Sequence, residues 1–158
     1  MKWAKWLENW DMTSLKINMK FLEMEWNPQE KDKDAAWELY IELLTRITTQ
    51  PLIKDVGDEK SALESINSIF KLTRDILKKY GRDCSEFAKI AIVILNQILR
   101  PFSAKWHKFD IEKLRDNKDM CSKFREELQN IQEVLCTYTQ MLSQMAGVED
   151  FTKLEDVQ

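Results

Sequence analysis

The sequence predicts an all-α protein: a single bundle of five to seven mostly antiparallel helices, with a central apolar helix at about 85–99 and a long last helix at about 117–146. One observation behind this prediction is a seam of eight side chains that recur at alternating spacings of three and four residues. That spacing places them on one face of a helix, whereas a strand would divide them between two faces. The other is the scarcity of turn residues, with three glycines and three prolines in 158 residues. The seam consists of Cys121, Phe124, Leu128, Ile131, Leu135, Tyr138, Leu142 and Met145.

The first element expected is a short helix at about 3–10. It aligns Trp3, Trp6 and Trp10 in one stripe, in a chain that contains six tryptophans. The stripe has three interpretations: a cap on the bundle core, a surface that docks on a partner protein, or an anchor in a membrane interface. Glu8 and Asp11 disfavour the membrane interpretation because they add negative charge beside the stripe.

The next segment, about 12–26, has two competing interpretations. Read as a helix, it carries apolar residues on two opposite sides and would be sandwiched between neighbours. Read as a strand, it alternates apolar and polar residues from Leu15 to Phe21. We prefer the helix, because the sequence offers no second alternating segment with which such a strand could pair.

Three further helices are expected between 33 and 99. The helix at about 33–48, with Asp32 or Asp34 as its N-cap, has apolar residues over more than half its circumference. The helix at about 58–80 has a narrower apolar stripe and ends in a basic turn before Gly81, so we place it on the outside of the bundle. The helix at about 85–99 is the most apolar and is predicted to be central.

The segment at about 102–116 is either a kinked continuation of the central helix or a loop that holds Trp106 and Phe109 against the core. The last helix follows, and its seam widens towards the C-terminal end. The wider seam favours burial in a multi-helix bundle over an exposed dimer zipper. The predicted organisation is one helical domain, 1–147, followed by an acidic tail, 148–158.

Composition and motifs argue against several function classes. The net charge is −3, from 27 acidic and 24 basic residues, and no basic block marks a nucleic-acid binder. The longest apolar run, 90–95, is too short to cross a membrane, and no signal peptide is recognisable. The three cysteines form no CxxC pair, which is typical of a reduced, cytoplasmic protein. We expect no metal and no cofactor, since zinc, di-iron and phosphate-loop motifs are all absent.

Two weak chemical candidates remain. Cys84 lies near a predicted helix N-terminus and could pair with His107, the one histidine, but a half-buried linker cysteine is the simpler interpretation. Lys89, Asn96 and Arg100 form a polar edge on the central helix, which Arg46 could join as an anion-binding site. The simpler interpretation of this edge is an exposed strip with local salt bridges.

The sequence therefore favours a non-catalytic protein–protein interaction module, a cytoplasmic subunit or adaptor of a larger assembly. The reason is that the second, third and fifth helices offer more apolar surface than a small bundle easily hides. One alternative is a small nucleotide- or anion-binding protein or enzyme that uses the polar edge. Another, by analogy alone, is an accessory component of a bacterial defence or toxin system. The candidate partner-binding residues are Trp3, Trp6, Trp10, Phe151 and Leu154.

Overall fold

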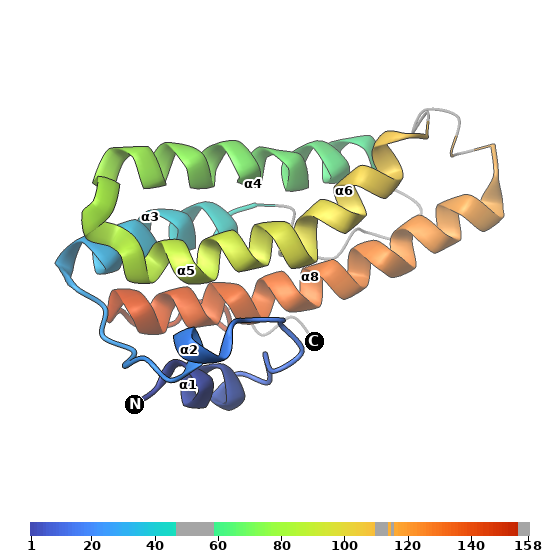
Figure 1. Ribbon diagram of the computed structural model, residues 1–158. Coiled ribbons are helices and arrows are strands. Elements are labelled where there is room, and N and C mark those ends of the chain that lie inside the picture. Colours follow the sequence, from blue (N-terminus) through green and yellow to red (C-terminus); the bar gives the residue numbers. More distant parts are fainter. Residues whose placement is uncertain (47–58, 110–113, 115, 155–158) are drawn as a thin grey trace.

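The long helical segments of the computed structural model, with 85–107 counted as one, run alongside one another, and each is antiparallel to the segment before it (Figure 1). The structure describes residues 1–46, 59–109, 114 and 116–154, and within them it contains no β-strand. The all-α bundle that the sequence predicts is confirmed. Its long elements are α3 (Glu30–Leu44), α4 (Glu59–Tyr80), α5 (Ser85–Ile94), α6 (Arg100–His107) and α8 (Lys118–Ala146).

Helix α3 contacts α4, α5 and α8, and its most extensive contacts are with α8. The seam on α8 explains this packing: Phe124, Leu128, Leu135, Tyr138 and Leu142 are all buried. Helix α3 begins at Glu30, three residues before its predicted start, and its predicted end at Thr48 lies outside the described residues. Asp32 is therefore inside the helix rather than its N-cap.

Helices α4 and α5 are joined by a tight turn that reverses the chain. Gly81 has a φ of +64°, a left-handed conformation that glycine adopts without a steric penalty, and a 3-10 turn, η2 (Gly81–Cys84), completes the reversal. The helix end expected at Gly81 is confirmed. The predicted start of α4 at Asp58 lies outside the described residues.

The apolar segment predicted as the central helix is helical from Ser85 onward, but not uniformly so. After α5 comes a π-helical turn, η3 (Leu95–Leu99), and then α6 without a break. Pro101 lacks a backbone N–H and its ring crowds the carbonyl four residues earlier, so the wider π turn accommodates it. The kinked helical continuation is therefore correct as far as His107, and residues 110–113 and 115 lie outside the described part.

One stretch within 59–107 is long and apolar enough to cross a membrane by length and composition. Only 39% of that stretch is buried inside the fold. Buried residues on α5 face the bundle, whereas Ile92 on the outer side is 46% exposed.

The expected helix at 12–26 is wrong, and so is the strand alternative. The segment contains only one short helix, α2 (Met19–Leu22), whose first turn is capped by the Asn18 side chain. The chain after α2 then returns alongside the first residues. The Trp3 backbone N–H donates to the Met24 carbonyl, and the Trp26 backbone N–H donates to the Met1 carbonyl. Thr13, Ser14 and Asn18 favour turns and caps, and tertiary contacts outweigh the helical periodicity.

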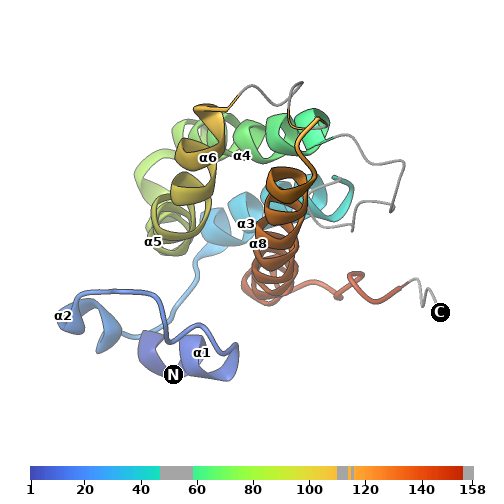
Figure 2. The ribbon, with the colours of Figure 1, turned by 90° about the vertical axis from the view of Figure 1, so that its right-hand side faces the viewer.

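The N-terminal segment, 1–26, forms a separate layer beneath α5 and α8 (Figure 2). It comprises α1 (Trp3–Asn9), α2 and the connections around them. The Gln97 side chain fixes one end of this layer, because it both accepts from the Lys16 backbone N–H and donates to the Lys16 carbonyl. The layer therefore closes the side of the bundle that α5 and α8 form.

Candidate functional site: an apolar groove between α3 and α4

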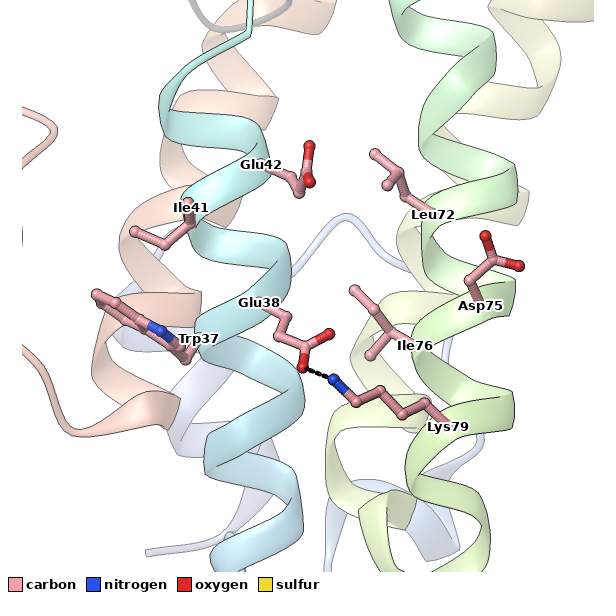
Figure 3. A pocket seen from close by; sticks show the side chains of 8 residues that line it. All are labelled: Trp37, Glu38, Ile41, Glu42, Leu72, Asp75, Ile76 and Lys79. Atoms are coloured by element: carbon pink, nitrogen blue, oxygen red, sulfur yellow. Dashed lines mark hydrogen bonds and ion pairs between the residues drawn. The ribbon is translucent and has the colours of Figure 1, made fainter.

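An open groove of about 410 Å³ lies between the antiparallel helices α3 and α4 (Figure 3). Leu72 and Ile76 of α4 point toward α3 and form its apolar wall, whereas Trp37 and Ile41 lie on the side of α3 that is turned away from α4. The side chains that line it are Trp37, Glu38, Ile41, Glu42, Leu72, Asp75, Ile76 and Lys79.

Helical spacing explains why these side chains gather. Trp37 and Ile41 are four residues apart on α3, as are Leu72 and Ile76 on α4, so each pair forms one ridge along its helix. Trp37 is 40% exposed and Ile41 is 37% exposed. Trp37 and Ile41 are therefore large apolar side chains in contact with water, beside a groove that Leu72 and Ile76 also line.

The polar side chains of the groove are held in ion pairs and hydrogen bonds. The Glu38 carboxylate accepts hydrogen bonds from the Lys79 ammonium and the Tyr80 hydroxyl, which join α3 to the end of α4. Partial burial works to raise the pKa of Glu38, but these two donors outweigh it and hold the pKa below its usual value. Glu42 Oε2 accepts from Nε and Nη2 of Arg46, at 3.2 and 2.8 Å.

Asp75 is the least engaged carboxylate of the groove. Its hydrogen-bonding partner is Lys71, at 3.4 Å on the same helix, and the two side chains are 58% and 79% exposed. Solvent screens such an exposed pair, so it contributes little to stability. Asp75 is therefore available to an incoming cation at small cost.

The C-terminal tail anchors close to this edge. The ring centroids of Trp37 and Tyr40 are 5.8 Å apart, and the buried Tyr40 places its hydroxyl against the tail. That hydroxyl accepts from the Phe151 backbone N–H at 2.7 Å. Phe151 and Leu154, predicted to bind a partner, are 37% and 73% exposed. The tail therefore adds exposed apolar side chains near Tyr40, and its last residues, 155–158, lie outside the described part.

The structure places the predicted tryptophan stripe mainly in the core. Trp3 and Trp6 are fully buried, and Trp10 is partly buried. Trp3 Nε1 donates to Glu86, and Trp6 and Trp10 both donate to Gln144 Oε1 at 2.8 Å. Of the three interpretations, the core cap accounts for these contacts. A partner could reach Trp3 or Trp6 only if the N-terminal layer moved.

The four predicted anion-binding residues are not collected into one site. Lys89 forms an ion pair with Glu86 at 3.0 Å, and Arg100 bonds to the Asn96 side chain. Arg46 contacts α4 at Ser68 and Arg100 contacts it at Phe70, positions about 200° apart around a helix of 3.6 residues per turn. Each cation thus has a local partner, and Arg46 and Arg100 approach α4 from opposite sides.

The structure also separates Cys84 from His107. Cys84 precedes α5, and His107 ends α6, so a helical segment about 35 Å long, at ~1.5 Å per residue, lies between them. Cys84 is fully buried, and burial, followed by the nearby charge of Asp32, raises the pKa of its thiol. The pair cannot act as a nucleophile and base. Among the described residues no cluster of three or more His, Cys, Asp or Glu side chains could hold a metal.

Sequence reasoning missed the groove, although it contained the signal for it. Apolar residues cover more than half the circumference of α3, more than its contacts with α4, α5 and α8 can bury. The apolar residues of α3 that remain exposed are Trp37 and Ile41.

Comparisons of the chain with known protein families, curated proteins and solved structures find no match.

Proposed function

We propose that this chain is a non-catalytic protein–protein interaction module, a cytoplasmic subunit or adaptor of a larger assembly, and that it docks through the groove between α3 and α4. One observation carries the proposal: Trp37, at 40% exposure, lines an open groove together with Ile41, Leu72 and Ile76. Tryptophan dominates the binding energy of many interfaces because one side chain offers a large, rigid contact surface.

The surroundings of Trp37 support docking rather than chemistry. Glu38, Glu42 and Lys79 are held by ion pairs across or along the helices, so they shape the groove and are poorly placed to exchange protons with a substrate. An apolar surface with a polar rim is the usual composition of a protein interface. The exposed Phe151 and Leu154 of the tail extend the apolar surface available to a partner.

Quantitative co-purification from the cells that make this protein tests the proposal. The groove variant combines Trp37→Ala with Ile41→Ser, and the control variant combines Met19→Ala with Ile92→Ser. Met19 and Ile92 are 71% and 46% exposed but lie on α2 and α5, away from the groove.

We expect the affinity of the groove variant for at least one co-purifying protein to fall by about thirtyfold or more, because removal of a hot-spot side chain costs about 2 kcal/mol or more. The control variant retains that protein. The melting temperature of each variant must stay close to that of the unmodified chain, so that the loss reports on binding. Equal recovery of every co-purifying protein with both variants would refute the proposal.

A further inference from the structure

We propose that the N-terminal layer, residues 1–26, is a lid: it opens from α5 and α8 as one cooperative unit while the helices of the bundle stay folded. Proteins open locally in contiguous units, often supersecondary motifs, and such an opening costs less free energy than unfolding of the whole chain. The layer lies outside the bundle in Figure 2, and the short linker 27–29 joins it to α3. Its place in the fold is therefore that of a unit that can leave the bundle intact.

The layer holds together through its own contacts. Four of its aromatic rings pack on one another: Trp3 lies edge-on to Trp6, with ring centroids 5.1 Å apart, and the pairs Trp3–Phe21 and Trp6–Trp26 are separated by 4.9 and 5.0 Å. Such aromatic pairs are stabilising beyond the area they bury. The backbone hydrogen bonds described above also join the first residues of the layer to its end. Residues 1–26 are therefore expected to open together rather than one by one.

The bundle does not need the layer to cap its first helix. The Gln29 backbone N–H donates to the Asp32 carboxylate at 2.8 Å, within the first turn of α3. Gln29 has an extended backbone, with φ of −92° and ψ of 176°, and Pro28 biases Asn27 to an extended conformation as well. The linker thus leads straight into a helix that is already capped, and opening of the layer leaves that cap in place.

The closed layer also carries polar groups at a cost. Trp3 Nε1 donates to Glu86, whose carboxylate is paired with Lys89 at 3.0 Å, and Lys89 Nζ lies 5.1 Å from the ring centroid of Phe21. The layer therefore covers an ion pair, and removal of charges from water opposes burial. The Nε1 of Trp26 is buried without a hydrogen-bonding partner among the described residues, which is a further cost. Both costs offset part of the apolar contact that keeps the lid closed.

Opening of the lid exposes side chains that the closed structure hides. Trp3 and Trp6 are fully buried when the layer is closed. They are also two of the residues that the sequence predicts to bind a partner. In the open state their indoles, and the face of α5 and α8 beneath them, come into contact with water.

Native-state hydrogen exchange of the full chain tests the inference, under conditions in which closing is faster than exchange. The layer probes are the backbone N–H groups of Trp3 and Trp26 and the indole N–H of Trp6. The bundle probes are the backbone N–H groups of Leu39 on α3 and Leu135 on α8, both fully buried. After correction for intrinsic rates, we expect the three layer probes to exchange at one common rate, at least about tenfold faster than the bundle probes.

Glu59→Gln separates opening of the lid from unfolding of the whole chain. Glu59 pairs with Arg125 between α4 and α8, and that ion pair stays formed when the lid alone opens. The variant is therefore expected to speed exchange of the bundle probes by about tenfold or more and to leave the rate of the layer probes unchanged.

Gln144→Ala tests whether the layer opens as one unit. Gln144 accepts from Trp6 and Trp10, and opening of the lid breaks both hydrogen bonds. In a cooperative opening, exchange at Trp3 and Trp26 accelerates by the same factor as at Trp6, about tenfold, although neither is the donor that the variant leaves unpaired. The control Gln129→Ala, at an exposed position on α8, changes none of these rates.

Two outcomes would overturn the lid. Equal acceleration of the layer and bundle probes by Glu59→Gln would mean that the layer opens only when the whole chain unfolds. Unequal rates among the three layer probes, with only the Trp6 indole responding to Gln144→Ala, would mean that residues 1–26 fray locally instead of opening together.

Discussion

The carboxylate of Asp32 accepts a hydrogen bond from the backbone N–H of Phe87 at 3.0 Å, and so joins two helices that are distant in sequence. Its other oxygen accepts from the Gln29 backbone N–H at 2.8 Å, so one buried side chain satisfies donors at the N-terminal ends of both α3 and α5. Backbone N–H groups in the first helical turn have no partner within the helix, and a carboxylate there also interacts favourably with the helix dipole.

Asp32→Ala is expected to destabilise the chain by about 3 kcal/mol, because each lost cap costs ~1 kcal/mol and the buried donors are left without a partner. The matched control is Asp34→Ala, since Asp34 is exposed and pairs with exposed Lys31 at 3.9 Å. The control should change stability by less than about 0.5 kcal/mol. Urea unfolding of both variants measures the difference, and a loss below about 1 kcal/mol for Asp32→Ala would contradict the double-cap role.

Gln144 holds the N-terminal layer on α8, because its Oε1 accepts from both Trp6 and Trp10. Gln144→Ala leaves the indole N–H of the fully buried Trp6 without its acceptor, at a cost of about 1–3 kcal/mol. Gln129→Ala, an exposed change on the same helix, serves as the control. Thermal unfolding and limited proteolysis within residues 1–26 check the prediction, and equal protection of the two variants would count against it.

The pair of Glu59 and Arg125 ties the start of α4 to α8. Glu59 is buried, and its carboxylate lies 2.7 Å from Arg125 Nη2. Burial works to raise the pKa of Glu59, but a backbone hydrogen bond and Arg125 outweigh it and hold the pKa below the ordinary 4.5. A carboxyl whose pKa is lowered by folding stabilises the folded state above its unfolded pKa and loses that contribution as the pH falls through the folded pKa.

Glu59→Gln is therefore expected to lower the free energy of unfolding by about 2 kcal/mol at pH 7. The gap between the unmodified chain and the variant should be constant above about pH 5 and shrink below the ordinary pKa of 4.5, where the carboxyl becomes neutral like the amide. Urea titrations from pH 7 to pH 3 measure it. A gap that stays constant over that range would exclude an ionised Glu59 as the source of the stability.

Tyr138, in the α8 seam, is a buried polar residue that, unlike Glu59, lacks a partner among the described residues. Its hydroxyl is buried and has no hydrogen-bonding partner among the described residues, and burial raises its pKa. Tyr138→Phe removes a desolvated polar group and keeps the ring, so we expect stability to be unchanged or to rise by up to about 1 kcal/mol. Loss of more than 1 kcal/mol in thermal or urea unfolding would show that the hydroxyl has an unrecognised partner.

Periodicity was sufficient to predict the bundle, because α4, α5 and α8 each bury one regular apolar face. The same reasoning failed for 12–26, where the apolar residues contact the bundle from an irregular chain. It also misplaced the start of α3, since Asp32 caps from inside the helix and reaches Phe87, a contact across 55 residues that no local pattern reveals.

The site was harder to predict for a physical reason. The chemical character of Trp3 and Trp37 is identical, and only tertiary packing decides that the first is buried while the second is exposed beside Ile41. Likewise, the sequence placed Lys89 and Arg100 on one polar edge, but each bonds to a residue one turn away on its own helix: Lys89 to Glu86 and Arg100 to Asn96.

The most direct test of the docking role is site-specific photocrosslinking in the cells that make this protein. A benzophenone amino acid is introduced at Ile41 in the groove or at Ile92 on α5, two exposed apolar positions on different sides of the bundle. We predict one discrete protein adduct from position 41 that is absent from position 92 and is lost when Trp37→Ala is added. No adduct from position 41, or the same adducts from both positions, would contradict the assignment of the groove as the docking surface.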